Sequence, residues 1–309
     1  MDTKDIPVFD YSDKDFIFSL DPNLKARFDG KLHNLWDNKM QTNCFRYKLG
    51  DLKTKYLPGS YNFVAQIIFT LTPKHWEKNL LNKEETDKGT FIINVSPIEE
   101  CHCLLVPGLE NGLPQVLNIN SLRLAVESLL ISNDRYLRVG FNSLGAYASV
   151  NHLHFHLYYL RYNLYLENAP VNHLIGNCYE LVQYPAEGFT FQVQDASEVV
   201  ETMKSVMKLI DFLIKEEIPH NLFFTRGKSF TDENVCSVVR IFVWARTAIY
   251  GSKNDYTFNA AVCELAGHII VKEEDGFETT NEEYIAAVLK EACHDIFFGI
   301  RDRVKALYL

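Results

Sequence analysis

The stretch VNHLHFHLYYL, residues 150–160, carries a histidine at every second position: His152, His154 and His156. Successive side chains of a β-strand point to opposite faces of a sheet. A strand here therefore places the three imidazoles on one face and the apolar residues between them on the other. A helix would scatter the three rings, and the interleaved aromatic and apolar residues favour a strand. The stretch predicts a strand with an imidazole-bearing face and a core-facing back.

The length and charge of the chain limit the classes of function. With 309 residues, 47% of them hydrophobic, the chain can bury one large core or two ordinary ones. The formal net charge of -9 argues against a surface that binds polyanions. Neither nucleic acid nor an acidic membrane is therefore expected as a partner, whereas a small anionic ligand needs only a local positive pocket.

The N-terminus and the cysteines indicate a compartment. The acidic N-terminal segment lacks the apolar run of a signal peptide, and no segment approaches membrane-spanning length. The seven cysteines are scattered, without the spacing of a disulfide framework or of a C-x-x-C zinc site. We expect reduced thiols and a cytoplasmic location.

Hydrophobic periodicity predicts an α+β fold, a mostly antiparallel sheet with packed helices. Residues 1–44 are polar and are expected to form an irregular lead-in. Residues 45–165 form a first half with the histidine strand, and residues 166–309 a second α+β half packed on it. A short similarity between ECHCLLV (100–106) and AGHIIV (266–271) suggests that the halves are related.

Three helices are predicted from their periodicity and caps. SLRLAVESLLI begins behind Asn120 or Ser121 as the N-cap, and residues 197–217 form a long amphipathic helix. A final helix is expected to open at Thr280, with Glu283 completing a capping box.

The histidine row is compatible with three kinds of chemistry, of which the first two are a zinc site and a satisfied polar face. The outer rings lie about 13 Å apart at the backbone, at ~3.3 Å per residue, so at most two could share a metal. His102, His268 or a carboxylate would then complete the site. A satisfied polar face needs a separate set of partners for each of the three buried rings.

The third possibility is nucleophilic catalysis on phosphorus. A neutral imidazole is a good nucleophile near pH 7 and can hold a nucleotidyl group between two transfers. A carbonyl or carboxylate on its other nitrogen would fix the tautomer, while flanking imidazoles or amides donate to the phosphoryl oxygens. A central histidine with polar neighbours on one strand face provides this arrangement.

The motif NHLHFHLYYL resembles the His-x-His-x-His/Gln motif of the histidine-triad superfamily. Its context GFNSLGAYASVNHLHFHLYYL is similar to the GDP-hexose phosphorylase branch. Further similar stretches are FRYKLGDLKTKYLPGSYNFVAQ, INVSPIEECHCLLVP, FFTRG, RIFVWAR and ELAGHI. The resemblance implies a histidine-triad-like fold and a phosphorylase that transfers the guanylyl group of GDP-glucose to inorganic phosphate. It implies no cofactor, and related proteins of this fold often form homodimers.

Carried over residue by residue, the resemblance assigns the nucleophile to His154. His156 stands where this branch often has glutamine, as a donor to the phosphates, and His152 helps to orient the site. Three polar residues just upstream match positions that lie near phosphates in related folds: Asn142, Ser149 and Asn151. Relatives can hold zinc on cysteine pairs, but this chain has a Cys-x-Cys without a second pair, so no metal is predicted.

Several residues outside the motif can be interpreted either as functional or as structural. Arg226 and Arg246 could clamp phosphates or serve as structural cations; we count Arg226 as substrate-binding. His102 and His268 lie in apolar strands, where a satisfied core histidine is commoner than a catalyst. Cys101 stands where the family commonly has glycine, which a strand should tolerate.

One segment departs from the family pattern. After residue 66 the family continues into an arginine-rich segment, whereas this chain is shorter there, so Lys74, His75 or Lys78 would have to hold phosphate. This leaves two alternatives open. The chain could be a catalytically silent nucleotide-binding paralogue, or it could act on another nucleotide such as a dinucleoside polyphosphate.

Overall fold

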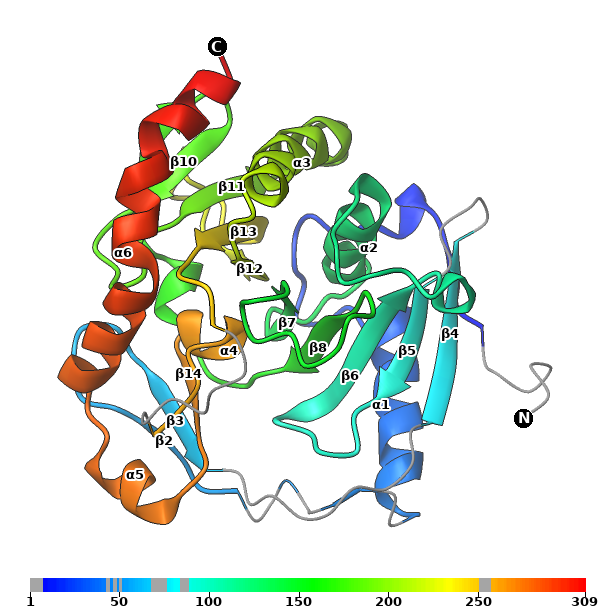
Figure 1. Ribbon diagram of the computed structural model, residues 1–309. Coiled ribbons are helices and arrows are strands. Elements are labelled where there is room, and N and C mark those ends of the chain that lie inside the picture. The colour runs from blue at the N-terminus through cyan, green and yellow to red at the C-terminus, as the bar shows by residue number, and fades with distance from the viewer. Residues whose placement is uncertain are drawn as a thin grey trace.

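The computed structural model describes residues 8–42, 45–46, 49, 52–67, 77–83, 89–249 and 257–309 (Figure 1). In this part of the chain, eleven strands form one large sheet and three form a small one. The order in the large sheet is β1 (Asp10–Tyr11), β4 (Glu77–Lys83), β5 (Gly89–Ile93), β6 (Glu100–Pro107), β8 (Phe155–Tyr159), β7 (Leu137–Asn142), β12 (His220–Gly227), β13 (Val238–Ala245), β11 (Phe189–Val193), β10 (Cys178–Leu181) and β9 (Val171–Ile175). The order in the small sheet is β14 (His268–Val271), β3 (Val64–Ile67) and β2 (Thr54–Tyr56).

The helices surround these sheets. The α-helices are α1 (Arg27–Met40), α2 (Ile119–Leu130), α3 (Val199–Lys215), α4 (Val262–Leu265), α5 (Glu274–Thr279) and α6 (Glu282–Leu307). Short 3₁₀ helices are η2 (Asp13–Asp15), η4 (Leu109–Asn111), η5 (Tyr165–Glu167) and η6 (Ala196–Glu198). No helix of the described ranges has the length and apolar character needed to cross a membrane.

Most neighbouring strands are antiparallel, which confirms the predicted α+β fold. Within the large sheet the β1–β4 pair is parallel, and in the small sheet the β14–β3 pair is parallel. Strands β7 and β12 pair through residues 138–142 and 221–225, so one continuous sheet crosses the predicted boundary near residue 165. The expected similarity between residues 100–106 and 266–271 does not mark equivalent strands. The first segment becomes β6 in the large sheet, and the second contributes β14 to the small one.

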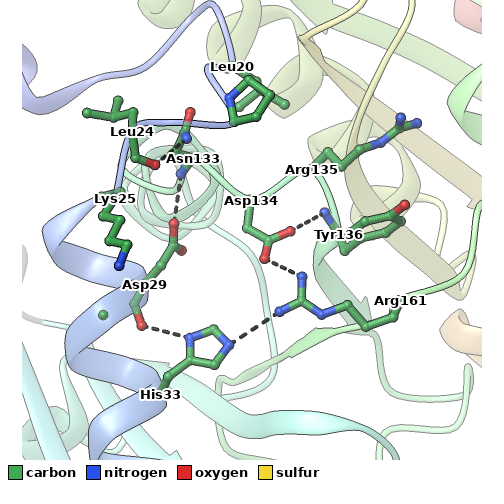
Figure 2. Close-up of a pocket in the computed structure, with 13 residues that line it drawn as sticks. Leu20, Leu24, Lys25, Asp29, His33, Asn133, Asp134, Arg135, Tyr136 and Arg161 are labelled. Atoms are coloured by element: carbon green, nitrogen blue, oxygen red, sulfur yellow. Dashed lines mark hydrogen bonds and ion pairs between the residues drawn. The ribbon is translucent and has the colours of Figure 1, made fainter.

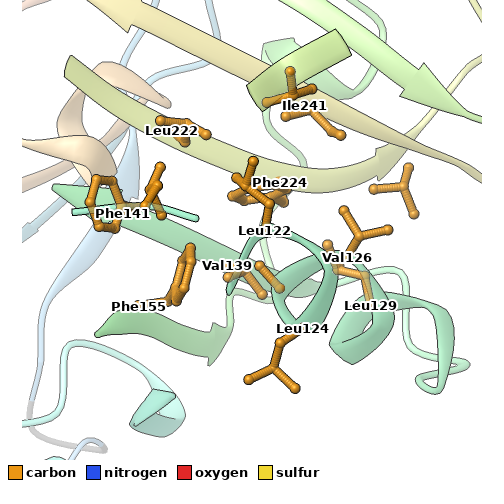
Figure 3. Packing of buried hydrophobic residues seen from close by; sticks show 14 of the residues in the cluster. Leu122, Leu124, Val126, Leu129, Val139, Phe141, Phe155, Leu222, Phe224 and Ile241 are labelled. Carbon is orange, nitrogen blue, oxygen red and sulfur yellow. The ribbon is translucent and has the colours of Figure 1, made fainter. Parts of the chain in front are cut away.

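The central strands are buried on both faces. On one face, alternate residues of β7, β8 and β12 pack against α2, as Figure 3 shows for Val139, Phe155 and Phe224 beside Leu122 and Leu129. On the other face, the strands contact the cluster that includes the small sheet and α4. Alternate side chains of each strand point to opposite faces, and both faces are buried because each is covered by a packed layer.

The irregular lead-in predicted for residues 1–44 is wrong over residues 27–40, which form helix α1. Its apolar residues Phe28, Leu32 and Trp36 recur every four positions and are buried. The polar composition around them hid this stripe, because the helix buries only one narrow face. Within the remaining residues 8–26, β1 and η2 are the regular elements. Residues 1–7 and 43–44 lie outside the described part.

Polar contacts attach α1 to strands β6 and β8 of the large sheet. The Asp29 carboxylate accepts hydrogen bonds from Tyr159 Oη (2.6 Å) and Ser132 Oγ (2.6 Å), and His33 Nε2 lies 3.2 Å from Glu100 Oε1. Figure 2 shows Asp29 and His33 on the wall of a hollow of about 470 Å³. The hydrogen bond with Glu100 raises the pKa of His33. Helix α1 therefore packs against β6 and β8, the strands of the half that carries the histidines.

The predicted caps lie one to three residues away from the observed ones. Helix α2 begins earlier, and Asn118 Oδ1 accepts a hydrogen bond from Ser121 N (2.9 Å), so Asn118 is the N-cap. Helix α6 is capped by Asn281 in place of Thr280, through Tyr284 N (2.9 Å). In each case an asparagine side chain competes with the neighbouring serine or threonine for the same role. The long amphipathic helix predicted at 197–217 is confirmed as α3.

Candidate active site

The histidine stretch forms a shorter strand than its pattern predicts. Strand β8 begins at Phe155, so His156 lies in the strand, and His152 and His154 lie in the segment that leads into it. The rings of His154 and His156 are neighbours, with centroids 5.4 Å apart and planes at 76°. The predicted shared face therefore holds for these two rings, while His152 contributes through its backbone.

The environment of His154 determines which nitrogen can react. Its Nδ1 lies 2.8 Å from the carbonyl oxygen of His152. A carbonyl oxygen can only accept, so Nδ1 carries the proton and Nε2 keeps its lone pair. The side chain is 4% exposed, and burial lowers the pKa of His154, more than the His152 carbonyl raises it. The result is a neutral imidazole with a free nucleophilic nitrogen.

Gln115 holds the backbone of His154 and was missed by sequence reasoning. Its Oε1 accepts from His154 N (3.0 Å), and its Nε2 donates to His154 O (3.2 Å) and to Asn142 O (2.8 Å). The paired residues of β7 and β8 end at Gly140 and His156, so the Gln115 amide lies where the next rung of the ladder would be. A buried glutamine that pairs with both the N–H and the C=O of one residue leaves the backbone of that residue little freedom.

The polar residues predicted upstream of the triad support this scaffold. Asn142 Oδ1 accepts from Asn221 Nδ2 (2.6 Å) and from Val262 N (3.0 Å), the first residue of α4. Asn151 Oδ1 accepts from Gln115 N (2.9 Å). Ser149 is exposed in the loop between β7 and β8. Asn142 and Asn151 thus organise the segment around His154, and their contact with phosphate, like that of Ser149, stays a prediction.

The prediction that Arg226 binds substrate is wrong. Its side chain is 2% exposed on the face of β12 that packs on α2, the face opposite the histidines. It donates to the carbonyl oxygens of Leu129 (2.8 Å), Ile17 (2.6 Å) and Ser237 (2.8 Å). Its position in the alternation of β12, two residues after Phe224, decides this face. Arg246 is also buried and donates to the carbonyl oxygens of Ala260 and Thr247.

His102 joins the site, although its apolar surroundings favoured a core role. Its Nε2 lies 3.1 Å from His156 Nδ1, and its Nδ1 accepts a hydrogen bond from Ile98 N (3.1 Å). A β-bulge makes this contact possible, because Cys101 and His102 together face the single residue Tyr158 of β8. The signal in the sequence was the glycine that the family commonly has before this histidine.

The expectation that a strand tolerates Cys101 needs correction. Cys101 has φ +55°, the left-handed conformation that glycine adopts at the first position of such a bulge. Its side chain is fully buried among apolar residues, which offsets part of the strain. The bulge turns Glu100 toward α1 and His102 toward the histidine pair.

A polar chain continues from this cluster into the small sheet. His268 Nε2 lies 3.2 Å from Gln66 Oε1, and Gln66 Nε2 donates to Glu99 Oε1 (2.7 Å) and to Thr54 Oγ1 (3.1 Å). His268 also lies beside the ring of Tyr158, with centroids 5.9 Å apart. His268 is therefore a buried histidine with a hydrogen-bond partner, as the core interpretation expects. His268, Gln66 and Glu99 come from three separate stretches that resemble the family, and they meet here. Burial raises the pKa of Glu99.

The histidine cluster is held in its uncharged form. Burial lowers the pKa of His156 to about 3, with a further contribution from His154, and lowers that of His102 well below its ordinary value. The site thus offers one nucleophilic lone pair and nearby N–H donors. Among the residues that the structure describes, no three His, Cys, Asp or Glu side chains gather as a metal site. Lys74 and His75 lie outside those residues, and only the backbone of Lys78 is described.

This arrangement of sheet and histidines defines a protein of the histidine-triad type. The crystal structure of yeast Ap4A phosphorylase Apa2 in complex with Ap4A shares the fold, with a TM-score of 0.60 and 14% identity over 87% of this chain and 96% of that chain. The chain belongs to the GDPGP1-like family. Residues 27–75 and 67–158 match the GDPGP1-like N-terminal domain, and residues 167–295 match the C-terminal domain.

Two relatives show how far the family likeness extends. GDP-D-glucose phosphorylase 1 of Danio rerio is 37% identical over 93% of this chain and 94% of its own length. GDP-D-glucose phosphorylase 1 of Bos taurus is 37% identical over 86% of this chain and 79% of its own. The likeness therefore covers both halves of the molecule.

Proposed function

We propose that this protein is a GDP-hexose phosphorylase that transfers the guanylyl group of GDP-glucose to inorganic phosphate, giving GDP and glucose 1-phosphate. The observation that carries the proposal is the hydrogen bond of His154 Nδ1 to the His152 carbonyl, which leaves Nε2 unprotonated. Membership of a family whose similar members are GDP-D-glucose phosphorylases supplies the substrate class.

The first step forms a covalent intermediate. His154 Nε2 attacks the α-phosphorus of GDP-glucose, and the bond from that phosphorus to the bridging oxygen breaks. Glucose 1-phosphate leaves with the electron pair. The guanylylated His154 then carries a positive charge, and its Nδ1–H still donates a hydrogen bond to the His152 carbonyl oxygen, which stabilises that charge. His156 donates to the phosphoryl oxygens, as the resemblance implies.

The second step returns the enzyme to its starting state. An oxygen of inorganic phosphate attacks the same phosphorus, the phosphorus–nitrogen bond breaks, and its electron pair returns to His154 Nε2. The product is GDP. A phosphate monoester has a second pKa of ~6, so glucose 1-phosphate leaves largely deprotonated at neutral pH. Inorganic phosphate carries unprotonated oxygens at neutral pH, and one of them attacks. Neither step therefore requires proton transfer by the enzyme.

The proposal extends to the partners and the organisation of the chain. GDP-hexose and phosphate are the expected ligands, without cofactor or metal, and a homodimer in the cytoplasm is the expected state. Residues 45–165, together with α1, would act as the catalytic half and residues 166–309 as the second half. The family models support this division, since one ends at residue 158 and the other begins at 167. Light scattering and cell fractionation test the assembly and the location.

Product analysis tests the function. The purified protein is mixed with GDP-glucose, GDP-mannose, GDP-galactose or a dinucleoside polyphosphate, with and without phosphate, and the products are separated by chromatography. Phosphate-dependent release of GDP and glucose 1-phosphate is expected. Product only from the dinucleoside polyphosphate would overturn the substrate assignment. Binding of GDP without turnover of any substrate would indicate a silent paralogue.

A further inference from the structure

A chain of three hydrogen-bonding groups fixes the proton positions in the histidine pair. The backbone N–H of Ile98 can only donate, and it points to His102 Nδ1 at 3.1 Å. A neutral His102 therefore carries its proton on Nε2. That nitrogen lies 3.1 Å from His156 Nδ1, so His102 donates and His156 Nδ1 accepts. The proton of His156 must then sit on Nε2.

The consequence is that His156 can serve a ligand only as a donor. Its single basic nitrogen is occupied by His102, and its other nitrogen already carries a proton. A glutamine at this position would present an amide N–H in the same way, with its oxygen accepting from His102. The structure thus gives a physical reason why histidine in this chain can replace the glutamine that the branch often has here.

This arrangement affects water and phosphate differently in the second step. Water must lose a proton as it attacks the guanylylated His154, so its attack is helped by a base at the site. Phosphate already has a bare oxygen, and an N–H donor helps to bind it. A His156 that can only donate a hydrogen bond therefore favours attack by phosphate over attack by water. A His156 with a free lone pair could take the proton of an attacking water.

We propose that His102 is a positioning residue which holds His156 as a hydrogen-bond donor and thereby suppresses hydrolysis of the covalent intermediate. The inference rests on the proposed function. In the reaction it suppresses, water oxygen would bond to the α-phosphorus, the phosphorus–nitrogen bond would break, and the water proton would pass to His156. GMP would be released in place of GDP. The ratio of GMP to GDP therefore reports directly on the role of His102.

The test compares His102→Leu with His102→Gln at fixed GDP-glucose and phosphate concentrations. Leucine removes the donor to His156, whereas the glutamine amide can still donate. We expect the GMP:GDP ratio to rise about tenfold or more in His102→Leu, since a positioned base contributes roughly 10²–10⁴-fold to a proton-transfer step. His102→Gln and His156→Gln should keep the wild-type ratio. An unchanged ratio in His102→Leu, with total turnover measured, would overturn the inference.

The matched control is His220→Leu. His220 is also buried, but it stacks on Phe141 on the opposite face of the sheet, and its hydrogen bonds and ring contacts within the described residues do not involve His102, His154 or His156. Its replacement should lower stability without altering the GMP:GDP ratio. Should His102→Leu not fold, ¹⁵N NMR of histidine-labelled wild-type protein reads the tautomers directly. The Nε2–H form is expected for His156, and finding the Nδ1–H form would contradict the proposal.

The experiment separates the two proposals. A wild-type protein that releases no GDP from any GDP-hexose would refute the proposed function. A wild-type protein that releases GDP, with the same product ratio in every His102 variant, would refute only the role of His102.

Discussion

The two faces of strands β7 and β8 differ in what holds them in place. On the face toward α2, Val139, Phe141 and Phe155 are buried by contact with other apolar side chains. On the opposite face, His154 and His156 are held by directional hydrogen bonds through Gln115 and His102. The apolar face gains stability from area removed from water, whereas the polar face gains a defined geometry, because each buried polar group needs its partner. Adjacent residues such as Phe155 and His156 therefore serve different roles: the first contributes to the stability of the core, and the second lies at the candidate active site.

The largest expected effect is on the polar face, at His154, the proposed nucleophile. His154→Ala should lower the rate of GDP-glucose turnover by about 10⁴-fold or more, as the removal of a covalent nucleophile does in other enzymes. Rapid-quench mass spectrometry should detect no guanylylated protein. The variant should fold, since it loses only a few hydrogen bonds. Normal turnover would remove His154 from the mechanism.

The adjacent residue provides the matched comparison on the apolar face. Phe155→Ala should lower the free energy of unfolding by about 3–5 kcal/mol, through lost burial and the cavity left behind. Denaturant unfolding measures this loss. In the folded fraction, turnover should fall far less than in His154→Ala. Equal losses of activity at residues 154 and 155 would show that the two faces are not separable.

Gln115 should affect both turnover and stability, because it is buried and holds the backbone of His154, the proposed nucleophile. Gln115→Ala leaves His154 N and two carbonyl oxygens without this partner, at a cost of about 1–3 kcal/mol for each such buried group left unsatisfied. We expect kcat to fall with little change in KM, since the nucleophile is displaced and the nucleotide contacts remain. A rise in KM alone would indicate that Gln115 acts on binding.

Arg226 is a polar residue on the apolar face and should behave as a structural one. Arg226→Met keeps the apolar stem and removes the donors to Leu129, Ile17 and Ser237. The free energy of unfolding should fall by about 2 kcal/mol. The value of kcat/KM per folded molecule should not change. A large increase in KM for phosphate would restore its predicted role as a substrate ligand.

The smallest expected effect is the dependence of stability on pH. The pKa of His156 is about 3 in the folded protein, below the ordinary value of 6.5, so the unfolded chain takes up a proton first as the pH falls. The contribution of His156 to stability is therefore present above pH 6.5 and is lost as the pH falls toward the folded value. One such group contributes at most about 1.4 kcal/mol per pH unit. His156→Gln should reduce the slope between pH 6.5 and 5, as measured by denaturant unfolding. An unchanged slope would contradict the lowered pKa.

Most of the fold could be read from local patterns. The strand that carries His156 and the amphipathic helix α3 both follow from periodicity over a few residues. Helix α1 was not predicted because only three of its residues form the buried apolar stripe, and the residues around them are polar. The N-caps of α2 and α6 were predicted at the wrong residues, because several Asn, Ser or Thr residues that can cap a helix lie close together at each N-terminus.

The amino-acid sequence by itself determined the alternation that separates imidazoles from core residues, because side-chain direction in a strand depends only on position along it. The tertiary structure alone decided which distant residues complete the site. Gln115 is 39 residues from His154, and His102 is 54 residues from His156. Contacts at such separations depend on strand order and on the bulge at Cys101. Strand order has no local signature, because it is set by the packing of segments that meet only in the folded chain.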